Sequence, residues 1–120
     1  MDYPVQQEEG GERITIIMVD SYVVKPDKLG EYPAFLKKLH ALIKKRPELF
    51  KEAKSIKFFS KFLGGTWGGF VEIYEFENLA DFEKCFNKVM HDKEFMTTIF
   101  AQLPNYLVPG SESVEIWNHV

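Results

Sequence analysis

The fold of this chain is decided by one stretch, VDSYVVKPDKLGEYPAF, at residues 19–35. An apolar run rich in β-branched residues stops at Pro26, and apolar side chains then recur at spacings of three and four, with lysines and glutamates between them. The stretch therefore predicts a strand that leads directly into an amphipathic helix. A second passage of the same kind, FVEIYEFENLADFEKCF, follows at residues 70–86.

The remaining elements follow from the same patterns. A strand is predicted at 13–24, and Pro33 belongs in the first turn of a helix that starts near Tyr32. Strands are predicted at 55–63 and 69–77, joined by a glycine-rich hairpin loop. The last strand is predicted at 113–120.

Asn78 is suited to cap a second helix, and a further helical piece follows the break at residues 91–92. The apolar side chains of these two helical pieces are expected to face inward: Leu79, Phe82, Phe86 and Val89 in the first, and Phe95, Ile99 and Leu103 in the second. This order of elements predicts an α+β fold, the ferredoxin-like βαββαβ arrangement, with a four-stranded antiparallel sheet and both helices on one face.

The first strand is apolar on both faces, and this matters because one layer of helices covers only one of them. Ile17 and Val19 point to one side, and Ile16 and Met18 point to the other. A large apolar face left open usually marks an interface, so we expect a homodimer in which two sheets pack face to face.

Composition restricts the function classes. The chain has 120 residues and a net charge of −3, so we expect one domain at residues 13–120 after a flexible acidic tail at residues 1–12. The lysines come with no nucleic-acid motif, and no apolar run approaches the length of a membrane span. With one cysteine, Cys85, and no visible leader, we expect a cytoplasmic protein that binds neither nucleic acid nor membrane.

Three short motifs resemble one superfamily. YVVKPDK at residues 22–28, YEFENLAD at 74–81 and HDKEF at 91–95 are similar to motifs of NIPSNAP-like and antibiotic-biosynthesis-monooxygenase-like proteins. These belong to the dimeric α+β barrel superfamily. The resemblance implies two copies forming a dimeric α+β barrel, with a ligand pocket between the sheet and the helices of each subunit.

The resemblance also bears on cofactors. Haem-degrading members of the superfamily use an asparagine, a tryptophan and an axial histidine at positions that fall here on Asp20, Cys85 and about Ile99. None of them matches, which disfavours haem degradation. The three histidines and Cys85 also lack metal-ligand spacing, so we expect no metal and no cofactor.

The candidate site residues are acids, phenols and one histidine. Asp20 interrupts an apolar strand, where a carboxyl must be paired or raised in pKa, and a catalytic and a structural role are equally open. Tyr22 points to the same face as Asp20, and Glu72 shares a face with Tyr74, which makes these three the candidate ligand-binding residues. His40 is the second catalytic candidate, although a boundary position on its helix is the favoured explanation.

Two functions remain open at this level. One is a homodimeric α+β barrel protein that binds a small, apolar organic ligand. The alternative is a cofactor-independent monooxygenase-like enzyme acting on a small aromatic or enolic molecule, in which Asp20 or His40 would remove a proton. A cavity beside Asp20 and Tyr22 would favour a ligand site, because such sites run from about 300 to 1,000 Å³. A filled interior would favour a module whose aromatic residues only form a core.

Overall fold

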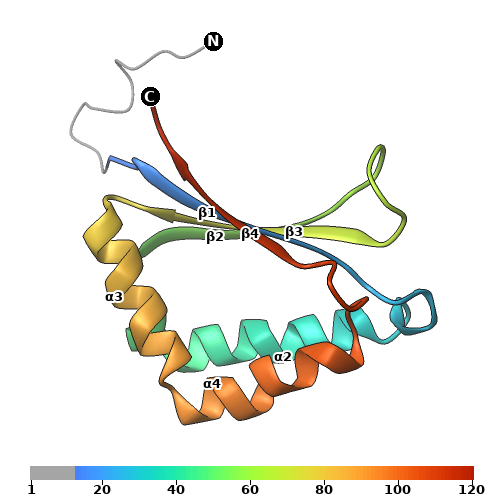
Figure 1. Cartoon of the computed structure of the whole chain (residues 1–120). Helices are drawn as coiled ribbons and strands as arrows, with labels where there is room; N and C mark the ends of the chain where they lie inside the picture. Colours follow the sequence, from blue (N-terminus) through green and yellow to red (C-terminus); the bar gives the residue numbers. More distant parts are fainter. Residues whose placement is uncertain (1–12) are drawn as a thin grey trace.

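The computed structural model describes residues 13–120, so the tail predicted at residues 1–12 lies outside the described residues. The elements follow one another as β1 (Ile16–Val23), η1 (Pro26–Lys28), α2 (Tyr32–Lys45), η2 (Pro47–Phe50), β2 (Ala53–Ser60), β3 (Gly69–Phe76), α3 (Leu79–Met90), α4 (Lys93–Thr98), η3 (Phe100–Asn105) and β4 (Ser113–Asn118). Figure 1 shows the strands as one curved layer and the helices as another.

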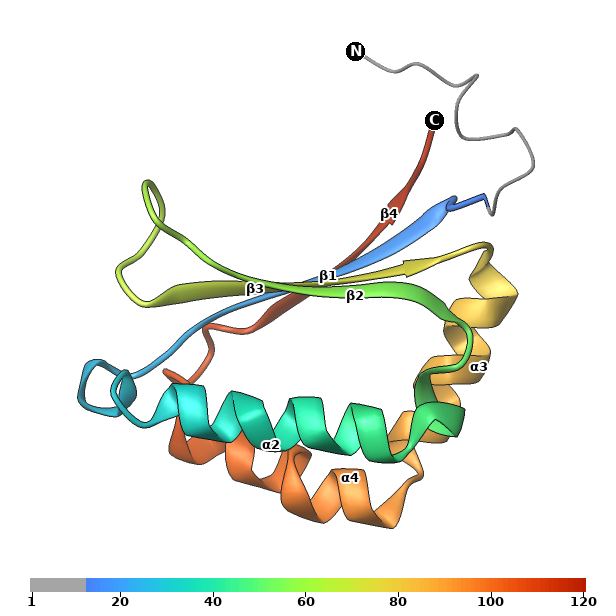
Figure 2. The ribbon, with the colours of Figure 1, turned by 180° about the vertical axis from the view of Figure 1, so that it is seen from behind.

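The four strands form one antiparallel sheet in the order β2-β3-β1-β4, with β1 and β3 in the centre. All three α-helices cover the same face of this sheet, and α2 and α4 lie side by side in both views (Figures 1 and 2). The predicted α+β, ferredoxin-like arrangement is therefore confirmed.

Local chemistry sets where the helices begin. α2 starts at Tyr32, which leaves Pro33 in the first turn, where its missing N–H costs nothing. The Asn78 side chain accepts a hydrogen bond from the Asp81 amide at 2.8 Å and caps α3. In the same way, Asp92 accepts from the Phe95 amide at 2.9 Å and caps α4.

The buried face of α3 differs in part from the predicted one. Leu79 is 50% exposed and Phe86 is 47% exposed, whereas Cys85 and Val89 are buried. Val89 and the partly buried Phe82 pack into the core as predicted, Cys85 joins them, and Phe86 lines the cavity described below. The inward positions predicted for the following helical piece are confirmed: Ile99 is buried, and Phe95 and Leu103 pack against the core.

The other face of the sheet has no helices over it. Val19 on β1 pairs with Ile73 on β3, and Ile17 pairs with Trp117 on β4, so these side chains share that face. Phe59 on β2 and Trp117 are each 50% exposed. The central strand β1 therefore has an apolar outer face, as its sequence predicted.

Candidate functional site

A cavity of about 300 Å³ lies between the sheet and the helices. Its walls are mostly apolar and come from every layer of the fold. The principal wall residues are Met18, Tyr22, Tyr74 and Phe76 from the sheet, Tyr32, Phe35 and Leu39 from α2, Phe82, Cys85 and Val89 from α3, and Phe95, Ile99 and Leu103 from the segment that follows. This volume is at the lower end of the range for small-molecule sites.

The mouth of the cavity lies beside β4. Of the lining residues, Phe86, Phe100, Glu112 and Val114 are exposed, and the last two stand at or just before that strand. The exposure of these residues leaves this edge of the cavity accessible. A ligand would enter here, past one carboxyl group and an apolar rim.

A chain of phenols ends on the buried carboxyl of Glu72. The Tyr22 hydroxyl donates to Glu72 Oε2 at 2.6 Å, and the Tyr74 hydroxyl donates to Oε1 at 2.8 Å. Tyr32 from α2 donates in turn to the Tyr22 hydroxyl at 2.5 Å. Both oxygens of Glu72 therefore accept hydrogen bonds, as an ionised carboxylate does.

Burial dominates the titration of this group. Glu72 is 8% exposed, and desolvation raises its pKa, an effect that the two phenol hydrogen bonds oppose. Desolvation likewise raises the pKa of Tyr22 and of Tyr74, and the neighbouring Glu72 carboxyl adds to both shifts. The phenols therefore stay protonated at neutral pH and act as hydrogen-bond donors.

Asp20 brings a second carboxyl to the same cavity. It lies opposite Glu72 in the β1–β3 register, and its Oδ1 atom is buried without a hydrogen-bond partner among the described residues. Desolvation, then a hydrogen bond with the Glu112 carboxyl and the charges of Glu112 and Glu72, raise the pKa of Asp20 to about 9. Two carboxyl groups hydrogen-bond only when one is protonated, and the raised pKa of Asp20 assigns that proton to Asp20 at neutral pH.

The cavity has acids but no matching bases. Within residues 13–120, no lysine, arginine or histidine lines it. In the same range, no group of three or more histidine, cysteine or acidic side chains is arranged to hold a metal ion. The polar end of the cavity is thus a set of acidic and phenolic groups facing an apolar space.

The structure brings four of the five candidate residues together. Asp20, Tyr22, Glu72 and Tyr74 all line the cavity. His40 does not: it is exposed on α2, and its ring lies 4.5 Å from that of Phe58 on β2. The contact explains this histidine as a residue at the boundary of the core.

Two further polar residues of the site escaped the sequence reasoning. Tyr32 shows in sequence only as an apolar position of a helix, and nothing there indicates that its hydroxyl meets Tyr22. Glu112 stands among exposed residues after a Pro-Gly turn, and only the pairing of β4 with β1 brings it near Asp20. The one signal in the sequence was the position of Glu112, which follows a turn and stands just before the strand that pairs with the Asp20 strand.

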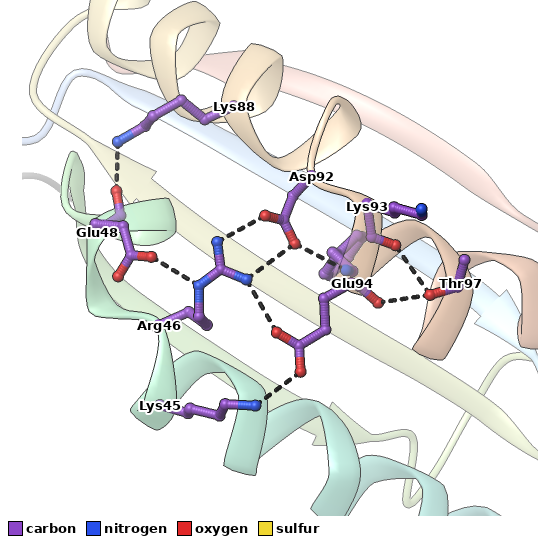
Figure 3. A network of polar contacts seen from close by, with 9 residues as sticks. Lys45, Arg46, Glu48, Lys88, Asp92, Lys93, Glu94 and Thr97 are labelled. Atoms are coloured by element: carbon purple, nitrogen blue, oxygen red, sulfur yellow. Dashed lines mark hydrogen bonds and ion pairs between the residues drawn. The ribbon is translucent and has the colours of Figure 1, made fainter.

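A network of ion pairs fixes the helices over the cavity (Figure 3). Arg46, at the end of α2, contacts Asp92 Oδ1 at 2.7 Å and Glu94 Oε1 at 3.0 Å. Asp92 also caps α4, so one arginine joins α2 to the start of the helix that carries Phe95. A backbone hydrogen bond at Phe95 and the Arg46 side chain lower the pKa of Asp92.

No protein-family model matches this sequence, and no curated protein matches it. Solved structures do match in shape. An uncharacterised NIPSNAP-like domain protein from Burkholderia xenovorans is 18% identical, with a TM-score of 0.69 over 88% of this chain and 85% of that one. An antibiotic biosynthesis monooxygenase is 14% identical, with a TM-score of 0.61 over 88% and 98%.

A third structure adds a statement on assembly. It is a dimeric protein of unknown function with a ferredoxin-like fold from Bacteroides fragilis, 13% identical, with a TM-score of 0.60 over 87% of this chain and 95% of that one. The resemblance seen in the sequence motifs is therefore confirmed at the level of fold. At such identities, the likeness carries the fold and not an activity. Separately, no helix in the described part of the chain is long and apolar enough to cross a membrane.

Proposed function

We propose that this chain is a homodimeric α+β barrel protein that binds a small, mainly apolar organic molecule in the cavity of each subunit. The observation that carries the proposal is the cavity of about 300 Å³ into which Asp20, Glu72 and three tyrosines converge. An apolar space with a few polar groups at one end is the usual form of a small-molecule site.

The energetics of the acids support this proposal. A carboxyl group removed from water without a compensating partner destabilises the fold, and apolar side chains of similar size would not. Asp20 is such a group at its Oδ1 atom, and Glu72, which lies opposite it, is buried with two phenol donors and no basic partner lining the cavity. Groups that destabilise a fold in this way and have a strongly shifted pKa are typical of functional sites.

The proposed dimer places the cavity away from the subunit interface. The second copy would pack on the outer face of the sheet, where Phe59 and Trp117 are half exposed and Ile17 on β1 is partly exposed. The cavity opens on the helical side, beside Glu112 and Val114. One of the structures with this fold is itself described as dimeric.

The enzyme alternative has one supporting observation. The phenol chain ending on Glu72, together with Asp20, places proton donors and acceptors against the cavity, as proton-transfer chemistry requires. Its proposed bases fit less well, because Asp20 is protonated at neutral pH and His40 lies outside the cavity. An enolate or phenolate formed beside Asp20 and Glu72 would also face two acids. Binding is therefore the better supported function.

The test is a titration with three phenyl compounds of similar size: 2-phenylethanol, 2-phenylethylammonium and 3-phenylpropanoate. Saturable amide shifts at cavity residues, followed by NMR on ¹⁵N-labelled protein, are expected for at least one of them. Val114→Trp should abolish the shifts because Val114 stands at the mouth. Ile116→Trp is the matched control, since Ile116 lies two residues further along β4 and does not line the cavity. No saturable binding of any of the three, or equal binding by Val114→Trp, would contradict the proposal.

A further inference from the structure

We propose that the cavity selects an organic cation, a molecule with an apolar body and one protonated amine whose ammonium group lies among Asp20, Glu72 and Glu112. This inference rests on the proposed ligand site and specifies the charge of its ligand. It comes from the imbalance of charge in the cavity, which has three carboxyl groups and, within residues 13–120, no basic side chain.

The first argument is the electrostatics of Asp20. The charged groups that act on it are the acids Glu112 and Glu72, and both raise its pKa. In an apolar surrounding, such repulsion is weakly screened. A cation placed between these carboxyl groups would be attracted by the charged acids and would favour the ionised form of Asp20, whereas an anion would be repelled.

The second argument is hydrogen bonding. Asp20 Oδ1 is buried and has no donor among the described residues, while both oxygens of Glu72 already accept from phenols. In the ionised form that a cation favours, this oxygen needs a donor, and an ammonium group offers three N–H donors and no acceptor. A carboxylate or a phenolate offers no donor to this oxygen.

The third argument concerns the rest of the molecule. Beyond the acids, the cavity is lined by aromatic and aliphatic side chains such as Phe35, Phe82 and Phe95. These walls suit an apolar body, and aromatic rings add an attraction for a nearby cation. A fully hydrated metal ion or a polar zwitterion would leave that apolar wall without contacts.

Within residues 13–120, no basic side chain lines the cavity to take the place of such a ligand. Residues 1–12 contain no lysine, arginine or histidine in their sequence. A second copy on the outer face of the sheet would stand on the side opposite the cavity. The counter-charge would therefore come from the ligand.

Proton linkage gives this proposal a distinct signature. The titratable groups around Asp20 are Glu72 and Tyr74 on β3, Tyr22 on β1, Tyr32 on α2, Cys85 on α3 and Glu112 before β4. An arriving ammonium group favours the ionised form of Asp20, so binding should release a proton to solvent. The affinity for a cation should therefore increase with pH between about 6 and 8, by at most about tenfold per unit for one released proton.

The experiment compares the charge series by isothermal titration calorimetry, using the intact chain. We expect 2-phenylethylammonium to bind at least about tenfold more tightly than 2-phenylethanol at pH 8, and 3-phenylpropanoate to bind most weakly. Repeating the titration in buffers of different ionisation enthalpy should reveal proton release for the ammonium compound only.

Two variants locate the effect. Asp20→Asn should remove most of the preference for the cation and its pH dependence, and Glu112→Gln should weaken the preference without abolishing it. Glu83→Gln, on the exposed surface of α3 and outside the cavity, removes one acid as a control and should leave the preference unchanged.

The outcomes separate the two proposals. Equal or tighter binding of 2-phenylethanol or 3-phenylpropanoate would overturn the inference of a cationic ligand and leave the ligand site intact. A cation preference that survives both Asp20→Asn and Glu112→Gln would also overturn it. No binding by any of the three compounds would overturn both proposals together.

Discussion

Asp20 and Glu72 lie directly opposite each other on the two central strands, so two carboxyl groups face one apolar cavity. Like charges at opposed positions of a sheet destabilise it, and burial makes the repulsion stronger. The two groups meet this conflict differently. Glu72 receives two phenol hydrogen bonds, whereas Asp20 keeps its proton and leaves Oδ1 without a partner.

Replacing Asp20 with asparagine should not destabilise the ligand-free protein at neutral pH. The pKa of Asp20 is raised from 3.8 to about 9, so its stabilising contribution is present in full below about 3.8 and is lost as pH rises through about 9. The melting temperature of Asp20→Asn should therefore increase relative to that of the wild type as pH rises from about 5 to 9.

Thermal melts across this pH range, with Glu83→Gln as the charge control, measure the difference. A loss of stability in Asp20→Asn that is the same at every pH would identify Asp20 as a structural hydrogen-bond partner instead. That result would also remove its proposed role at the ligand site.

The phenols that donate to Glu72 should matter more than the other tyrosines of the core. Tyr22→Phe or Tyr74→Phe leaves one oxygen of a buried carboxyl without its donor, which should cost about 1–3 kcal/mol of unfolding free energy. Tyr32→Phe removes only a bond between two hydroxyls and should cost less.

Urea unfolding of the four tyrosine variants would measure these differences. Tyr106→Phe is the matched control because the Tyr106 ring packs against Tyr32 and Phe35 in the same cluster. An equal loss in all four variants would show that ring packing, and not the carboxyl, determines their cost.

Arg46 should hold the two helical segments together only while its partners are ionised. Arg46→Met should lower the melting temperature more than Lys45→Met, because Arg46 contacts both Asp92 and Glu94 whereas Lys45 contacts Glu94. The pKa of Asp92 is lowered from 3.8, so its contribution is present above about 3.8 and is lost as pH falls through the lower folded value. Melts of both variants at neutral and at strongly acidic pH should show the difference disappearing in acid. A difference that persists there would assign it to packing of the arginine stem.

The proposed dimer should depend on the outer face of the sheet. Phe59→Glu puts a charge into that face and should shift the protein toward monomer at micromolar concentration, as followed by sedimentation velocity. Leu79→Glu is the control: Leu79 is also 50% exposed but stands in the first turn of α3, where a carboxylate is tolerated. A wild-type protein that sediments as a monomer would contradict the dimer itself.

Cys85 should be inert toward thiol reagents in the folded protein. It is buried, its thiol donates to the Leu49 carbonyl at 3.4 Å, and desolvation raises its pKa to about 11. Because the thiolate is the reactive form, Ellman's reagent at neutral pH should label it slowly until urea unfolds the chain. Rapid labelling without denaturant would show that the cavity opens to solvent beside α3.

The sequence determined the order of elements and the antiparallel sheet, because hydrophobic periodicity and turn chemistry act between near neighbours in the chain. It also indicated Asp20 as an acid in an apolar strand, and the alternation of side chains placed Tyr22 with it and Tyr74 with Glu72.

Only the tertiary structure decided what these residues meet. The β1–β3 register set Asp20 opposite Glu72, the packing of α2 brought the Tyr32 hydroxyl to Tyr22, and the pairing of β4 brought Glu112 to the mouth. The side of α3 that lines the cavity with Phe86, and the position of His40 outside the cavity, depend equally on how whole elements pack. Such contacts join positions far apart in the chain, and no local pattern encodes the register or the helix rotation that creates them.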